Sequence, residues 1–155
     1  MGKNQVIVRK PRTDELDTTI ILMEYYRDEA NLPDGEYDPQ EMAKTVRHYM
    51  INGDYCWYNL YDNNRPVGLV GGYLAQIPWS KNLIAHIQFL YTLPSHRTVA
   101  NAKMLTDEFE FWAKNNECVR LSAGDIGINP DRTRAFYQQV GFKDTGCWLS
   151  KELSE

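Results

Sequence analysis

The side chains best suited to chemistry fall in two stretches of the C-terminal half. Residues 84–103 read IAHIQFLYTLPSHRTVANAK, and they contain His86 and Arg97 followed by a run of small residues. Residues 129–142 read NPDRTRAFYQQVGF, and they contain Asn129 and Tyr137. An imidazole, with an ordinary pKa of about 6.5, can accept a proton, and a phenol, with a pKa of about 10, can donate one. The two stretches therefore offer a candidate base and a candidate acid.

The first stretch joins a strand to a helix. Alternating, β-prone residues predict a strand over residues 84–93, and apolar residues at helical spacing predict a helix over residues 101–114. The turn between them is a helix N-terminus, whose unpaired N–H groups and positive dipole end bind phosphate oxygens. Purely structural turns of this kind are common, so the turn alone does not establish a phosphate site.

Both stretches resemble motifs of the GNAT superfamily of acyl-CoA-dependent N-acyltransferases. The family motif after its fourth strand is Arg or Gln, two variable residues, Gly, one variable residue, and Gly or Ala. Here residues 97–102 read RTVANA, with Ala100 in place of the central glycine. Residues 129–142 resemble the C-terminal motif of the same family. The resemblance runs from about Pro66 to Leu153, while the N-terminal third is compatible with the family but not diagnostic.

The resemblance implies acetyl-CoA as the acyl donor. Backbone N–H groups from Thr98 to Lys103 would hold the pyrophosphate, and the strand backbone at Leu90 to Thr92 would bind the pantetheine and polarise the thioester carbonyl. Tyr137 would donate a proton to the leaving thiolate, and a half-buried structural tyrosine beside Phe136 and Val140 is the alternative. The cofactor-binding residues that the resemblance implies are Leu90, Tyr91, Thr92, Arg97, Thr98, Val99, Ala100, Asn101, Ala102, Lys103, Asn129, Arg132 and Tyr137.

The general base is harder to assign. Many family members place a glutamate on the strand before the phosphate turn, but residues 84–93 contain no acid. On a regular strand, His86, Gln88 and Leu90 share one face. Their order resembles the serotonin N-acetyltransferase branch, in which two histidines at this spacing relay a proton through water, although the second is glutamine here. His86 is therefore the candidate catalytic base, and a structural strand histidine is the alternative.

An acidic cluster between two predicted helices is a candidate attractant for a cationic acceptor. Its members are Asp28, Glu29, Asp34, Glu36, Asp38 and Glu41. A solvated loop with helix caps explains them equally well. His48 and His96 form no metal-binding spacing with His86, and there is no HExxH motif, so we expect no metal site.

The remaining pattern predicts an α+β fold with three layers. A short strand near residues 5–9 precedes two helices, one capped by Thr13 and ending near residue 31, the other starting at Asp38 and Pro39 and reaching residue 50. The turn DNNRP joins strands over residues 55–61 and 67–75 into a hairpin. A strand over residues 119–123, a helix from Pro130 to Gly141 and a last strand over residues 144–151 follow.

This order gives a mixed sheet with helices on both faces, in agreement with the GNAT fold, which has about six to seven strands and about four helices. In that fold the central parallel strands splay apart and admit the pantetheine arm of CoA, a feature that only the resemblance implies.

Composition limits the class of protein. The 155 residues, 43% of them hydrophobic, fit one domain over residues 1–155, and a net charge of -4 argues against general binding to nucleic acid or to anionic membranes. No apolar run is long enough to span a membrane. The cysteines Cys56, Cys118 and Cys147 form no CxxC pair, which favours a reducing cytoplasm.

We therefore expect a cytoplasmic GNAT-type N-acetyltransferase that moves an acetyl group from acetyl-CoA directly to a primary amine of a small molecule or peptide. One alternative is a GNAT-fold module that binds CoA but has lost catalysis. Another is a protein-interaction protein that binds no CoA. A homodimer is left open, because Tyr55, Trp57, Tyr58 and Tyr61 fit either a core or an interface.

Overall fold

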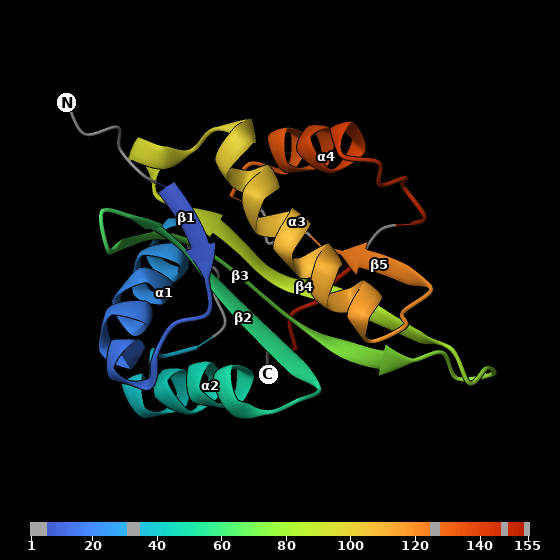
Figure 1. Ribbon diagram of the computed structural model, residues 1–155, viewed down its shortest axis with the longest axis horizontal. Helices are drawn as coiled ribbons and strands as arrows, with labels where there is room; N and C mark the ends of the chain where they lie inside the picture. Colours follow the sequence, from blue (N-terminus) through green and yellow to red (C-terminus); the bar gives the residue numbers. More distant parts are fainter. Residues whose placement is uncertain (1–5, 31–34, 125–127, 147–148, 154–155) are drawn as a thin grey trace.

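The computed structural model describes residues 6–30, 35–124, 128–146 and 149–153. In chain order its elements are β1 (Val6–Arg9), a 3-10 turn (Thr13–Glu15), α1 (Leu16–Ala30), α2 (Pro39–Ile51), β2 (Tyr55–Asp62), β3 (Arg65–Gln76), β4 (Leu83–Thr92), a 3-10 turn (Pro94–His96), α3 (Val99–Asn115), β5 (Arg120–Ala123) and α4 (Pro130–Gln139). Figure 1 shows the twisted sheet with α3 lying across it. The three-layer α+β class expected from the sequence is confirmed.

The sheet is mixed, as expected. Its order is β1-β2-β3-β4-β5, with antiparallel pairs up to β4 and a parallel pair between β4 and β5. The described residues form five strands, fewer than expected. The described part of the predicted last strand is not a strand: Gly146 has a φ of +150°, and Leu149 is 89% exposed. Because no neighbouring strand pairs with these residues, nothing stabilises the extended state.

The two faces of the sheet carry separate cores. On one face α3 and α4 bury Leu105, Phe109 and Tyr137 against β2 to β4. On the other face α1 and α2 bury Leu22, Tyr26 and Val46 against the same strands, so neither face is left to water. Cys56 lies in the first core, Cys118 is half-buried, both are free, and Cys147 lies outside the described residues. No helix within the described ranges is long and apolar enough to cross a membrane.

Local sequence explains where the elements start and turn. The Asp38 carboxylate accepts hydrogen bonds from the backbone N–H groups of Gln40 and Glu41, so the predicted cap of α2 is confirmed. Asn63 and Asn64, with φ of 49° and 67°, make the tight β2–β3 turn, because asparagine tolerates the left-handed region. The Thr13 cap is wrong: Thr13 lies in the 3-10 turn, and α1 starts at Leu16.

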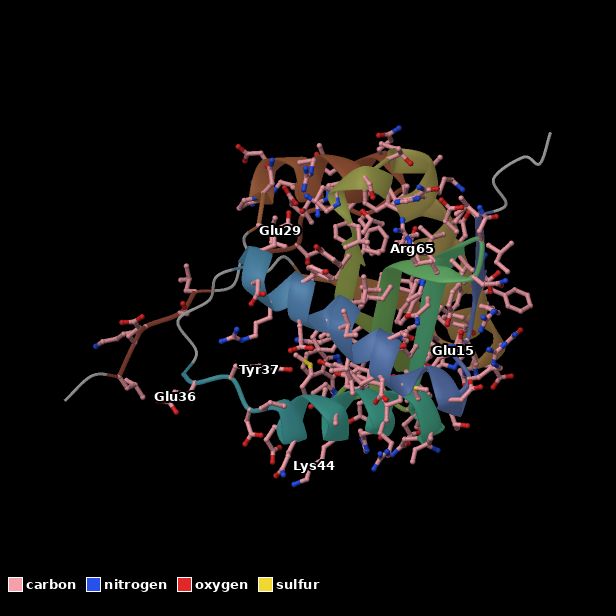
Figure 2. All side chains as sticks on the ribbon, turned by 90° about the vertical axis from the view of Figure 1, so that its left-hand side faces the viewer. Glu15, Glu29, Glu36, Tyr37, Lys44 and Arg65 are labelled. Carbon is pink, nitrogen blue, oxygen red and sulfur yellow. The ribbon has the colours of Figure 1, made fainter. Side chains whose placement is uncertain are left out.

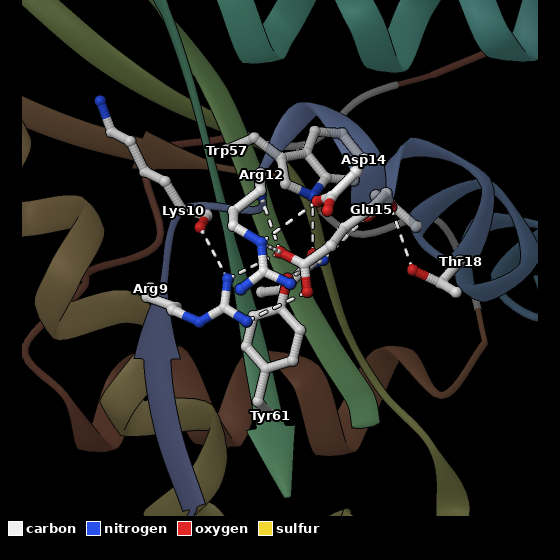
Figure 3. A network of polar contacts seen from close by, with 10 residues as sticks. Arg9, Lys10, Arg12, Asp14, Glu15, Thr18, Trp57 and Tyr61 are labelled. Atoms are coloured by element: carbon white, nitrogen blue, oxygen red, sulfur yellow. Dashed lines mark hydrogen bonds and ion pairs between the residues drawn. The ribbon is translucent and has the colours of Figure 1, made fainter. Parts of the chain in front are cut away.

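The carboxylate of Glu15 replaces the expected cap as the organiser of this corner. It accepts hydrogen bonds from both terminal nitrogens of Arg9, at 2.7 and 3.0 Å, and from the backbone N–H of Arg12 at 2.8 Å (Figure 3). The hydrogen bonds from Arg9 are the largest cause that lowers the pKa of Glu15 to about 2. This network ties β1 to the start of α1.

A β-bulge interrupts β4 at Gln88. Gly71 pairs with Phe89 and Gly72 pairs with Ile87, which leaves Gln88 without a partner on β3. A side chain at Gly72 would overlap the carbonyl oxygen of His86, so the bulge requires glycine there. The bulge also reverses the alternation of side chains. Leu90 packs in the core on the α3 face, whereas Phe89 packs on the α1 and α2 face.

The expectation that His86, Gln88 and Leu90 share one face is therefore wrong for Leu90. Ala85 and Ile87 belong to the core on the α3 face, so the intervening His86 points to the α1 and α2 face. The expectation assumed a regular strand, and the bulge makes this strand irregular.

Candidate active site

The parallel pairing between β4 and β5 covers only the first part of β4. Pairing between β4 and β5 ends at Ile87 and Ala123, just before the bulge. From there β4 continues to Thr92, whereas β5 ends at Ala123. A cleft with a cavity of about 140 Å³ lies between β4, α3 and α4.

Most of the residues predicted to bind acetyl-CoA line this cleft. They are Leu90, Tyr91, Thr92, Arg97, Thr98, Val99, Ala102, Arg132 and Tyr137. Four residues of that prediction and the candidate base do not line it: Ala100, Asn101, Lys103, Asn129 and His86. Sequence reasoning did not place seven other lining residues in the site: Tyr26, Ile87, Gln88, Gly124, Ile128, Thr133 and Phe136. The spacing of Thr133 and Tyr137 along one side of α4 was the signal available for Thr133.

The turn between β4 and α3, which we call the phosphate turn, offers fewer backbone N–H groups without an acceptor than expected. Thr98 caps α3, and its hydroxyl accepts a hydrogen bond from the backbone N–H of Asn101 at 3.1 Å. The N–H of Thr98 bonds to His96, and that of Ala102 begins the helical ladder. Within the described residues, the N–H groups of Val99 and Ala100 have no acceptor. These two donors and the positive end of the α3 dipole can receive a phosphate.

The guanidinium of Arg97 is held by protein groups. Its two terminal nitrogens donate to the two carboxylate oxygens of Glu29 at 2.6 and 2.8 Å, and one of them also donates to the Thr92 carbonyl at 2.7 Å. The hydroxyl of Tyr91 donates to Glu29 at 2.7 Å. The hydrogen bond from Arg97 is the largest cause that lowers the pKa of Glu29. Arg97 therefore fastens α1 to the end of β4 (Figure 2 shows Glu29 and Glu15 at opposite ends of α1).

The acidic cluster does not form one pocket in the described residues. Glu29 is bonded to Arg97 and Tyr91, Asp38 caps α2, and Glu41 contacts Lys44 at 3.2 Å. Asp28 contacts its neighbour Arg27 at 3.2 Å and has a 71% exposed side chain. Glu36 is exposed, and Asp34 lies outside the described residues. Helix caps and ion pairs account for the acids whose contacts are described.

A second contact fixes the phosphate turn from the other side. His96 shares a hydrogen bond of 2.7 Å between its Nε2 and the Asp62 carboxylate at the end of β2. Its Nδ1 lies 2.8 Å from the hydroxyl oxygen of Ser95. The side-chain amide of Asn101 donates to the His96 carbonyl at 2.9 Å, which links the turn to the first coil of α3. The predicted binding residue Asn101 thus has a structural contact here.

The candidate base His86 lies beside the cleft. Its Nδ1 is 2.8 Å from the hydroxyl oxygen of Ser122 on β5, and its ring is 5.3 Å from the ring of Tyr73. Burial lowers the pKa of His86 below its ordinary value, so the imidazole is neutral at pH 7 and can accept a proton. The next residues on β4, Ile87 and Gln88, line the cleft.

The candidate acid Tyr137 is buried at the wall of the cleft. It is 8% exposed, and its ring packs against Phe136 and Phe142 with centroid distances of 5.5 and 5.0 Å. Asn129 caps α4 by accepting a hydrogen bond from the backbone N–H of Arg132 at 3.2 Å, so it orients the helix that carries Tyr137. Across the described ranges, no group of three His, Cys, Asp or Glu side chains could hold a metal ion.

Known proteins share this fold. A predicted acetyltransferase from Clostridium acetobutylicum, solved with acetyl-CoA, superposes with a TM-score of 0.80 at 16% identity over 96% of both chains. The aminoglycoside acetyltransferase AAC(6')-Iy, solved with the bisubstrate analogue CoA-S-monomethyl-acetylneamine, superposes with a TM-score of 0.76 at 14% identity over 97% of this chain and 99% of that one.

One curated relative matches part of the sequence. An aminoglycoside N(6')-acetyltransferase type 1 of Acinetobacter haemolyticus is 29% identical over 72 residues, 45% of this chain. The match spans 49% of that relative, about half of its length. The sequence model of the acetyltransferase (GNAT) family matches residues 20–142, which is most of the chain. Because this match covers most of the chain, the chain belongs to the acetyltransferase (GNAT) family.

Proposed function

We propose that the protein transfers an acetyl group from acetyl-CoA to the primary amine of a small molecule. The observation that carries this proposal is the cleft between β4, α3 and α4, because it runs along the part of β4 that β5 does not cover and reaches the N-terminus of α3. The cleft therefore combines an unpaired strand edge with a phosphate site. The names of the aminoglycoside acetyltransferases that resemble the chain support a small-molecule amine as acceptor.

The donor would lie along β4. The N–H groups of Val99 and Ala100 would bind the pyrophosphate, and the backbone of Leu90 to Thr92 would pair with the pantetheine amides. Ala100 has only a methyl group, so it leaves room for the backbone to approach a phosphate, although less than glycine would. Arg132 lies on the opposite wall and adds positive charge to the cleft.

The chemistry would be a direct transfer. The amine nitrogen attacks the thioester carbonyl carbon, the carbon–sulfur bond breaks, and the amide forms. Tyr137 donates its phenolic proton to the leaving thiolate, whose conjugate thiol has an ordinary pKa of about 8.5, and His86 takes the proton released by the amine, directly or through water. Positioning of the two reactants would supply most of the rate. Acetyl-CoA would be the acyl donor and no metal would take part.

The role of Tyr137 can be tested by removing one oxygen atom. Tyr137→Phe keeps the ring packing but has no proton to donate, so we expect kcat to fall by about a hundredfold with acetyl-CoA affinity unchanged. Thiol release measures kcat, and calorimetric titration measures affinity. Tyr25→Phe, on the exposed side of α1, is the matched control. An unchanged kcat in Tyr137→Phe would remove Tyr137 from the reaction.

A CoA-binding module without catalysis is the second candidate. It is favoured by one observation: no aspartate or glutamate lines the cleft within the described residues, so a carboxylate base is lacking there. A thermal shift with acetyl-CoA but no thiol release with any amine would identify this function. A cytoplasmic location, where acetyl-CoA is available, belongs to the same proposal.

A further inference from the structure

Four side chains form one row across the sheet beside the cleft. Tyr55 of β2 pairs with Tyr73 of β3, Tyr73 pairs with His86 of β4, and His86 pairs with Ser122 of β5. Register partners point to the same face, and their contacts agree: the two tyrosine rings are 5.9 Å apart, and Tyr73 is 5.3 Å from His86. We call these four residues the aromatic row.

The helix α2 closes one end of the aromatic row. The rings of His48 and Tyr49 lie 4.4 and 4.8 Å from the ring of Tyr55. A second hollow of about 360 Å³ opens here, and Lys44, Thr45, His48, Tyr49 and Tyr55 line it. Burial is the largest cause that raises the pKa of Tyr49 to about 12, so this phenol stays neutral at physiological pH.

The aromatic row adjoins the cleft through β4, which carries both His86 and the cleft-lining residues. Ile87 and Gln88, which line the cleft, directly follow His86 on β4. The phosphate turn lies beyond Thr92, at the opposite end of the same strand. A molecule whose body covers Tyr55 and Tyr73 would therefore bring an attached amine to His86 and to the thioester.

The charges around both hollows do not suit a polycation. No aspartate or glutamate lines either hollow in the part of the chain that the structure describes, whereas Lys44, Arg97 and Arg132 do. Glu29, which bonds to the lining residues Tyr91 and Arg97, is already neutralised by Arg97. The partly buried aromatic rings of Tyr55 and Tyr73 instead favour a flat apolar surface.

We propose that the acceptor is a primary amine carried by a single flat apolar or aromatic body, which binds on the aromatic row, and that polycationic amines are poor acceptors. This inference rests on the proposed transfer function and names its acceptor class. It departs from the polycationic acceptors that the names of the related aminoglycoside enzymes indicate.

The first test compares acceptors in the thiol-release assay with acetyl-CoA. The probes are 2-phenylethylamine, which has a ring, propylamine, which has none, and neamine, which is a polycation. We expect kcat/KM for 2-phenylethylamine to exceed that for each of the other two by about tenfold or more, since a filled apolar site is worth that factor. Neamine as the best acceptor would overturn the inference and leave the transfer function standing.

The second test removes the ring at the centre of the row. Tyr73→Ala should raise KM for 2-phenylethylamine by about tenfold with little change for propylamine, which does not reach the ring. Tyr73→Leu removes the flat ring but keeps enough volume to fill the core, so it serves if the alanine variant is poorly folded. Tyr25→Ala, at an exposed tyrosine of α1, is the control. Equal losses for the ringed and ringless amines would show a structural role and overturn the inference.

Binding separates failure of this inference from failure of the transfer function. Calorimetric titration of 2-phenylethylamine into the CoA-loaded protein and into its Tyr73→Leu variant needs no turnover. Binding that is weakened about tenfold by Tyr73→Leu supports the aromatic row even if no amine is acetylated, and the transfer function alone then fails. No binding to the native protein, or equal binding to both proteins, overturns the inference.

Discussion

The donor half of the cleft and the aromatic row are built in different ways. The donor half takes its groups from a short stretch of chain, the β4 end, the turn and the start of α3, and two contacts brace it from outside, Arg97 with Glu29 and His96 with Asp62. The aromatic row takes one side chain from each of four strands. The first half presents backbone donors, and the second presents side-chain surfaces.

This difference explains what each half can recognise. Backbone N–H groups at a helix end bind any phosphate and depend little on side-chain identity, so the loss of the motif glycine at Ala100 is tolerable. Acceptor recognition depends on which side chains the strands bring together, and it can vary while the fold stays the same. The two halves should therefore respond differently to substitution.

The largest effect should come from a charge at the phosphate turn. Ala100→Glu places a carboxylate where the pyrophosphate would bind, so we expect the Kd for acetyl-CoA to rise by about a hundredfold. The same carboxylate interacts favourably with the positive end of the α3 dipole, so the free energy of unfolding should not fall. Calorimetric titration and chemical denaturation measure the two quantities.

The control for this change is Ala100→Gln, which has the same size without the charge. We expect only a few-fold loss of affinity in this variant. If Ala100→Glu bound acetyl-CoA as tightly as Ala100→Gln, the pyrophosphate would not lie at this turn.

A smaller effect should follow from breaking the ion pair between Glu29 and Arg97. Glu29→Gln removes the charge that pairs with this guanidinium, so we expect a loss of about 2 kcal/mol in the free energy of unfolding and an increase of about tenfold in the Kd for acetyl-CoA. Glu15→Gln, at the other end of α1, removes a similar contact with Arg9 far from the cleft and should reduce stability alone. Equal affinities in the two variants would mean that Glu29 does not position the turn.

The pH dependence of turnover should show the smallest effect. Burial lowers the pKa of His86, so the neutral base persists below pH 6.5, and kcat/KM should fall only as the pH drops through this lowered pKa. The free energy of unfolding should also decrease as the pH drops. The unfolded histidine has the higher pKa and takes up its proton first, so stability falls below about pH 6.5. His86→Gln should remove this decrease of kcat/KM at low pH. A variant that keeps the decrease would show that another group is the base.

The sequence predicted the strand, the turn and the helix of the donor half because their signals are local. These signals are contiguous: the strand before Leu93, the turn, and the small residues after Arg97. A helix that begins there must leave its first backbone N–H groups without partners inside the helix. The cap at Asp38 and the turn at Asn63 are local in the same sense. Three of the predicted binding residues, Ala100, Asn101 and Lys103, lie on the turn or helix but not on the cleft wall.

The rest of the site depends on register, which one sequence does not reveal. The bulge at Gln88 places Leu90 on the opposite face of the sheet from His86. The sequence feature that accompanies the bulge is Gly72, which lies on the neighbouring strand. The pairings of Tyr55 with Tyr73, and of Tyr73 and Ser122 with His86, join residues distant along the chain. In the sequence, Glu29 is one of several acids and nothing marks it as the partner of Arg97. The packing of α1 against β4 brings Glu29, and not another of these acids, to Arg97.

We propose that this chain moves an acetyl group from acetyl-CoA to an amine bound beside β4. The most direct test is mass spectrometry of 2-phenylethylamine, propylamine and neamine, each incubated separately with the protein and acetyl-CoA, with thiol release followed in the same samples. We expect at least one amine to gain a single acetyl group in equal amount to the thiol released, at a rate reduced about a hundredfold in Tyr137→Phe. Thiol release without any acetylated amine, or acetylation that is unaffected in that variant, would contradict it.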